Sequence, residues 1–114
     1  MEVIEKPRIK VVFQGRDTKK GAYTQYHIFS LRSKREIHPH RTEQSKTGHH
    51  WDDIWYLFPA RYFISYIDIT NSGKHHCGYA CLNVREDGYE LLPWEGRVPK
   101  FAKHTLCHCL EASQ

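Results

Sequence analysis

Short segments in which apolar and polar residues alternate, separated by polar turns, run through most of the chain. Residues 8–15 and 23–33 are rich in β-branched and aromatic side chains, and residues 75–84 place Cys77, Tyr79 and Cys81 in one row and Gly78, Ala80, Leu82 and Val84 in the other. Alternation with a period of two is typical of half-buried strands. The turn NSGK predicts a hairpin between 61–70 and 75–84, and the turn RDTKKGA predicts another between 8–15 and 23–33.

The remaining apolar segments complete the predicted fold. Residues 89–94 predict one more short strand, and Pro59 should divide 51–69 into a short strand or turn of helix and a following strand. Residues 98–112 place apolar side chains at helical spacing, with Pro99 in a suitable first-turn position. We therefore predict an α+β fold, a twisted antiparallel sheet of about five strands with two hairpins and one C-terminal helix.

One segment shows neither kind of pattern. Residues 34–50, KREIHPHRTEQSKTGHH, have almost no apolar side chains and no periodicity.

The length of the chain bears on the number of domains. A chain of 114 residues is a common size for one domain. We expect a single domain over 1–114, with a mobile, basic and histidine-rich surface loop at about 34–50. Long loops of this kind often carry function.

Charge is unevenly distributed along the chain, whose net charge is +4. Residues 1–50 have a balance of +6 and residues 51–114 a balance of −2. A basic half favours a polyanionic partner. We predict a small domain that binds nucleic acid, RNA or DNA, through its N-terminal half. The candidate contact residues are Arg8, Lys10, Lys19, Lys20, Arg32, Lys34, Arg35 and Arg41, with Trp51 as a surface on which a base stacks.

Two other classes of function remain open. A small histidine- or metal-dependent nuclease needs general acids and bases, and imidazoles and a carboxylate lie in or beside the 34–50 segment. Its candidate residues are His38, His40, His49, His50 and Asp52. A cysteine nucleophile such as Cys77 paired with His50 is a further enzymatic alternative. A protein-interaction module, an inhibitor or adaptor with a protein partner, is the other alternative. We expect a binding protein rather than an enzyme.

The stretch HHCGYACLNV (75–84) raises the question of a metal site. In a regular strand Cys77 and Cys81 share a face, but their Cα atoms lie roughly 13 Å apart, which is too far for one ion. We therefore expect the two cysteines to pack in one row and no cofactor to be bound. The alternative is structural zinc held by Cys77, Cys81, His104 and His108, which requires a bend at Gly78.

The chain lacks an apolar run near the roughly 18 residues that a membrane-spanning helix needs, and its N-terminus does not resemble a secretory signal. We expect an intracellular protein, cytoplasmic or nuclear, with no membrane association. In such a compartment the four cysteines should be free thiols or metal ligands rather than disulfides.

Overall fold

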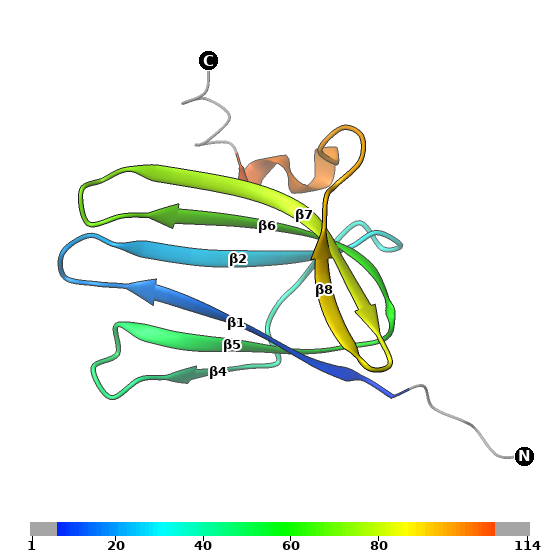
Figure 1. Cartoon of the computed structure of the whole chain (residues 1–114), viewed down its shortest axis with the longest axis horizontal. Coiled ribbons are helices and arrows are strands. Elements are labelled where there is room, and N and C mark those ends of the chain that lie inside the picture. The colour runs from blue at the N-terminus through cyan, green and yellow to red at the C-terminus, as the bar shows by residue number, and fades with distance from the viewer. Residues whose placement is uncertain (1–6, 107–114) are drawn as a thin grey trace, which may run out of the picture.

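The computed structural model describes residues 7–106, and strands dominate this part of the chain (Figure 1). Strands hold 57% of the described residues and one short 3₁₀ helix holds 6%. The elements are β1 (Ile9–Asp17), β2 (Tyr23–Ser30), β3 (Glu36–Ile37), β4 (Arg41–Gln44), β5 (His50–Leu57), β6 (Ala60–Ile69), β7 (His75–Arg85), β8 (Gly88–Leu92) and the 3₁₀ helix η1 (Lys100–Thr105).

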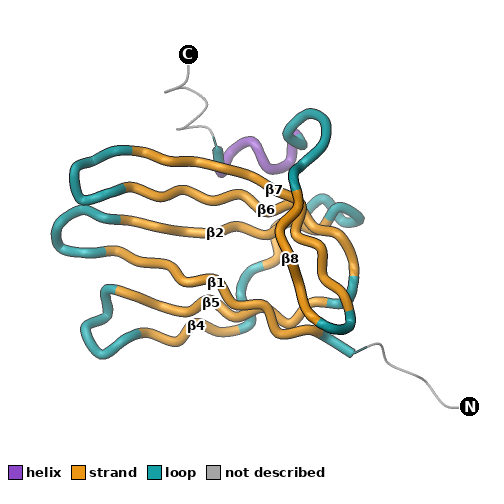
Figure 2. Tube along the Cα trace, viewed as in Figure 1, coloured by secondary structure: helices purple, strands orange, loops and turns teal. Residues whose placement is uncertain are grey.

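All the strands belong to one antiparallel sheet. Its order is β4-β5-β1-β2-β6-β7-β8, and β3 pairs with β2 beside this path. The sheet curls into a half-barrel. Figure 2 shows three hairpin loops at one end of the sheet, on the left, and β8 crossing the view at the other end. The predicted hairpin between 61–70 and 75–84 is confirmed, because β6 and β7 pair without a break from Ala60↔Val84 to Ile69↔His75.

The predicted α+β class is wrong, because the described chain is mostly β and has more strands than five. The helix prediction for 98–112 fails as far as the structure describes it. Residues 100–105 form a 3₁₀ helix, in which the Ala102 N–H donates to the Pro99 carbonyl and the Leu106 N–H donates to the Lys103 carbonyl. Residues i and i+3 share a side of a 3₁₀ helix, so the apolar spacing fits it too. Residues 107–112 lie outside the described residues.

The segment 34–50 contains regular structure that its composition did not predict. Strand β3 pairs with β2, and β4 pairs with β5 from Arg41↔Ile54 to Gln44↔Trp51. All four residues of β4 are exposed, so no apolar pattern marks the strand. The backbone of β5 holds it in place, and the Thr42 hydroxyl donates to the Asp53 carboxylate at 2.7 Å. The segment is therefore not a plain loop, while its mobility remains a prediction.

Both faces of the sheet bury apolar side chains. The inner face of the curl holds one cluster, made of Val11, Ile28, Trp55, Leu57, Tyr62, Ile64, Leu82 and Val84. On the opposite face Phe29 and Phe63 pack with Ala102 and Leu106, so η1 covers that side of the sheet. Fully burying a side chain such as Phe63 stabilises the fold by about 1.5–3 kcal/mol. These two clusters fix the sheet that positions the surface residues described below.

The half-barrel has an open side between β1 and β8. Strand β1 pairs with β2 only at Arg16 and Asp17, next to the hairpin turn. Farther along, β2 pairs with β3, so β1 diverges from it. The hydroxyl of Tyr89 in β8 fills part of this gap, because it accepts from the Val12 N–H and donates to the Val12 carbonyl, each at 3.3 Å. One side chain therefore joins β8 to β1.

Candidate nucleic-acid interface

An arginine-lined hollow lies where β2 ends and β6 begins. Its volume is about 840 Å³, within the range of pockets that hold small ligands. We call it the arginine pocket. Its lining residues are Pro7, Arg8, Ser30, Leu31, Arg32, Phe58, Pro59, Ala60, Arg61 and Tyr62. Leucine, phenylalanine, proline, alanine and tyrosine side chains supply an apolar surface, and the three arginines supply the charge.

The turn between β5 and β6 forms the apolar part of the pocket. Pro59 cannot donate a backbone hydrogen bond, and the pairing of β5 ends at Leu57. The Tyr62 hydroxyl donates to the Phe58 carbonyl at 2.7 Å and fixes the turn. Phe58 consequently stays at the surface with 44% of its area exposed. An exposed phenylalanine on a fixed turn is suited to contact a ligand.

The loop that follows β2 presents Arg32. The Ser30 N–H donates to the Arg35 carbonyl and the Lys34 N–H donates to the Ser30 carbonyl, both at 2.9 Å. Lys34 adopts a φ of 59°, a left-handed conformation uncommon for a residue other than glycine. These contacts close the loop into a tight turn. Arg32, Lys34 and Arg35 are all exposed on it.

The charge of the arginine pocket is uncompensated within the described residues. No aspartate or glutamate lines it, and none of Arg8, Arg32 and Arg61 forms an ion pair with a described carboxylate. The Arg8 guanidinium carbon lies 4.7 Å from the centroid of the Phe58 ring, which is a cation–π contact. Guanidinium groups bind phosphate oxygens in pairs, and they stack on flat rings. The pocket therefore suits a ligand that has both an anionic group and an aromatic group.

A second hollow of about 500 Å³ adjoins this pocket and shares Leu31 and Arg61 with it. Trp94, Cys81 and Glu95 are among its other lining residues. The Trp94 ring packs edge-on against Phe63 at 4.9 Å, which fixes its position. Cys81 is a buried free thiol, and burial raises its pKa, with the nearby Arg61 charge acting in the opposite direction.

The predicted basic residues divide between two ends of the sheet. Arg8 and Arg32 line the arginine pocket, and Lys34 and Arg35 lie in the loop beside it. Lys19 and Lys20 lie at the opposite end of the strands, in the turn between β1 and β2. Lys10 is exposed near the start of β1, two residues after Arg8, but it does not line the pocket. Arg41 on β4 pairs with Glu43 at 3.3 Å. The charge distribution along the chain did not single out Arg61. The only feature of the sequence that marks this residue is its position two residues after Pro59.

Trp51 has a structural contact that its sequence neighbours did not reveal. Its ring lies directly on Gly15 of β1, where a Cβ atom would come within 2.2 Å of the indole nitrogen. The same indole N–H donates to the Asp53 carboxylate at 3.2 Å. Trp51 is half-buried, so one side of its ring is occupied by the protein itself. Its role as a stacking surface for a base remains a prediction.

The candidate catalytic residues are not gathered into one site. His38 lies 3.5 Å from Glu36, and His40 contacts the Tyr56 ring edge-on at 5.3 Å. The pair His49 and His50 lies beyond β4, at the turn that leads into β5. His50 and Asp52 do line one shallow hollow of about 180 Å³, together with Glu43, Gln14, Gln44, Ser45 and Trp51. The four histidines thus occupy two separate places.

The candidate metal ligands also lie apart. Strand β7 pairs with β6 without interruption through Gly78, so no bend brings Cys77 and Cys81 together. Cys77 takes part in a disulfide, contrary to the expectation of free thiols, whereas Cys81 is free. His104 is exposed in η1, and His108 lies outside the described residues. Between residues 7 and 106, no three histidine, cysteine, aspartate or glutamate side chains are grouped so as to hold a metal.

No family model matches the chain, and neither does any curated protein or solved structure. Among residues 7–106 no helix has the length and apolar character required to cross a membrane.

Proposed function

We propose that this protein binds single-stranded nucleic acid at the arginine pocket. One observation carries the proposal: Arg8, Arg32 and Arg61 come from distant parts of the sequence and surround an apolar surface that, among residues 7–106, no carboxylate lines. Proteins that bind single strands combine positive charge, which follows the phosphates, with aromatic rings and guanidinium planes on which bases stack. Phosphate oxygens would bind the guanidinium groups, and a base would stack beside Phe58.

The neighbouring hollow favours a chain of nucleotides over a single small anion. It shares Arg61 with the arginine pocket and adds the fixed ring of Trp94. Two adjacent hollows on either side of one arginine suit two consecutive nucleotides, whose linking phosphate would lie at Arg61. The positive net charge of the chain adds attraction at longer range.

The test is fluorescence anisotropy with short labelled oligonucleotides of DNA and RNA at low salt. Loss of a base-stacking ring in Phe58→Ala should weaken binding by about 1–3 kcal/mol. Arg61→Ala should weaken binding and lower the slope of log K against log salt by about 0.7 for each lost contact with a single-stranded phosphate.

Arg85→Ala is the matched control. It removes the same side chain from an exposed site outside the candidate contact residues, where Glu90 already compensates the charge, 3.3 Å away. We expect it to leave affinity nearly unchanged. An equal loss in Arg85→Ala and Arg61→Ala would show that binding depends on net charge and not on the pocket. If the wild type binds no oligonucleotide at low salt, the proposal is wrong and a protein-interaction module becomes the better hypothesis.

A further inference from the structure

Three hairpin turns of the same design lie at the end of the sheet opposite the arginine pocket. Each starts with a hydroxyl residue and closes three residues later with a glycine of positive φ: 92° at Gly21, 74° at Gly48 and 82° at Gly73. In each turn the glycine N–H donates to the carbonyl of the hydroxyl residue, at 2.9–3.0 Å. The turns are Thr18–Gly21, Ser45–Gly48 and Thr70–Gly73.

The three turns form one continuous row. They join β4 to β5, β1 to β2, and β6 to β7, and these strands are consecutive in the sheet. The Asp17 N–H donates to the His49 carbonyl at 2.8 Å, which joins the first two turns, and Tyr23 pairs with Ile69 beside the third. Six strands at about 4.8 Å spacing make the row roughly 24 Å long. Figure 1 shows the three loops side by side on the left.

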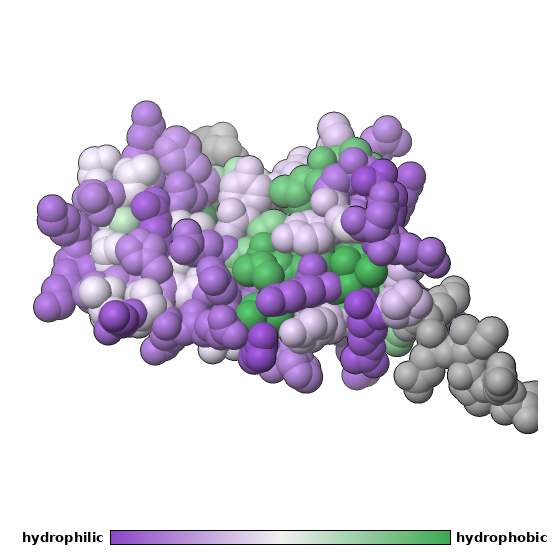
Figure 3. Space-filling model, turned by 60° about the horizontal axis from the view of Figure 1, so that its bottom comes forward, coloured by the Kyte–Doolittle hydropathy of each residue, from purple (hydrophilic) through white to green (hydrophobic). Residues whose placement is uncertain are grey.

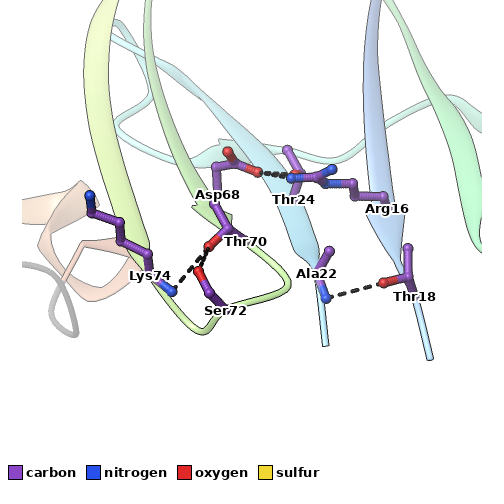
Figure 4. A network of polar contacts seen from close by, with 8 residues as sticks. All are labelled: Arg16, Thr18, Ala22, Thr24, Asp68, Thr70, Ser72 and Lys74. Atoms are coloured by element: carbon purple, nitrogen blue, oxygen red, sulfur yellow. Dashed lines mark hydrogen bonds and ion pairs between the residues drawn. The ribbon is translucent and has the colours of Figure 1, made fainter. Parts of the chain in front are cut away.

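This row carries positive charge. Its exposed lysines are Lys19, Lys20, Lys46 and Lys74, and we call it the lysine row. Asp17 and Glu43 are the carboxylates nearest to these lysines along the chain. Glu43 is paired with Arg41 at 3.3 Å, and Asp68 is bound by Arg16 at 2.9 Å and by Thr24 (Figure 4). The Lys74 side chain in the same view extends away from the hydrogen bonds of its turn.

The chemistry of the lysine row favours phosphates over a lipid bilayer. The turns contain threonine, serine, lysine, asparagine and glycine, with no large apolar side chain that could insert into a membrane. Figure 3 shows hydrophilic surface at this end, on the left, while the apolar surface gathers farther to the right. Amide groups and lysines on such turns are suited to contact phosphate oxygens at the surface.

We infer that the lysine row binds the phosphate backbone of the same nucleic-acid strand whose bases occupy the arginine pocket. This inference rests on the proposed function and extends it to a second contact. The two sites lie at opposite ends of β2, whose eight residues span roughly 25 Å. A strand stacked as in a duplex rises about 3.4 Å per nucleotide, so about eight nucleotides cover that distance, and a more extended strand needs fewer. A stacked tetranucleotide therefore reaches only one site.

The experiment compares a tetranucleotide with a 20-nucleotide strand. The test variant replaces all four lysines with glutamine (Lys19→Gln, Lys20→Gln, Lys46→Gln and Lys74→Gln), and it keeps the hydroxyl and glycine residues that form the turns. For the 20-mer we expect the slope of log K against log salt to fall by about 3 and the affinity in 0.1 M salt to fall at least tenfold. For the tetranucleotide we expect less than a twofold change. Circular dichroism and thermal unfolding establish that the variant is folded.

Arg61→Ala separates this inference from the proposed function. It should weaken the tetranucleotide and the 20-mer alike, since both need the arginine pocket. If the lysine variant binds the 20-mer as the wild type does while Arg61→Ala still weakens it, the lysine row has no role and the proposed function stands. If only the lysine variant loses affinity, the pocket assignment is wrong. Tight binding to phosphatidylserine vesicles that depends on the four lysines, with no effect on the 20-mer, would assign the row to a membrane instead.

Discussion

Replacing Gly15 with alanine tests whether β1 needs a glycine at this position because the Trp51 ring occupies the space of a side chain. The added Cβ would lie 2.2 Å from the Trp51 indole nitrogen and 2.3 Å from the adjoining ring carbon. Real contacts of this kind are much longer, so the ring must move. Moving it also strains the 3.2 Å hydrogen bond from the indole to Asp53.

The size of the effect follows from two opposing contributions. Overpacking typically costs about 1–3 kcal/mol, and a weakened hydrogen bond adds about 0.5–1.5 kcal/mol. Alanine also reduces the conformational entropy of the unfolded chain, which stabilises the folded state by about 0.4–1 kcal/mol. Trp51 is only half-buried, so its ring has room to shift. We therefore expect Gly15→Ala to lower the free energy of unfolding by about 1–2 kcal/mol, which lowers the melting temperature by roughly 4–8 °C for each kcal/mol.

A double-mutant cycle checks this reasoning by urea unfolding. The proteins are the wild type, Gly15→Ala, Trp51→Ala and the double variant. Once the ring is absent, the alanine meets no obstacle, so Gly15→Ala should cost nothing or stabilise slightly in the Trp51→Ala background. Equal costs of Gly15→Ala in both backgrounds would mean that the ring contact is not the reason for the glycine.

Three further predictions concern single side chains. Thr24, followed by Arg16, holds the pKa of Asp68 below its ordinary value by hydrogen bonding to the carboxylate. Its contribution is present at neutral pH and is lost progressively as the pH falls below about 4, so Asp68→Asn should cost less than about 1 kcal/mol at pH 7 and still less in acid, as measured by urea unfolding at neutral and at acidic pH. Burial raises the pKa of the Cys81 thiol, so mass spectrometry after alkylation at pH 7.5 should find it unmodified until denaturant is added, and rapid labelling of the native protein would contradict its burial. Tyr89→Phe should lower the unfolding free energy by about 1 kcal/mol through its lost hydrogen bonds, and an unchanged urea midpoint would show that they contribute nothing.

The part of the fold that the sequence predicted best is the hairpin of β6 and β7. In β6 the buried residues form one continuous run, 62–65, in β7 apolar residues recur at 80, 82 and 84, and the turn between the strands has strong turn residues, so both strands and their pairing were predictable. Cys77 and Cys81 fall on one face for the same reason, and both contribute to the core on that side or its margin. Strand β4 carries no such signal, since its four side chains are exposed and only its backbone pairing with β5 makes it a strand.

The candidate site was predictable only in part. Charge distribution pointed to Arg8 and Arg32, but nothing in the sequence places them beside each other or beside Arg61. That proximity comes from the sheet order, which brings the start of β1, the end of β2 and the β5–β6 turn to one end. The lysines at 19, 20, 46 and 74 are likewise far apart along the chain. Their common position depends on three hairpins that point the same way.

The phenol that joins β8 to β1 also limits which strands can join the sheet from outside. Where β1 diverges from β2, its backbone at Val12 would otherwise offer a free N–H and carbonyl to any extended peptide, and open edges of this kind are where chains aggregate. Because the Tyr89 hydroxyl already binds both groups, and its ring packs 6.0 Å from Phe13, an incoming strand must first displace a side chain of the protein itself. The Tyr89 side chain thus disfavours self-association through this edge. It occupies the backbone groups of β1 that a further strand, closing the barrel, would otherwise bind.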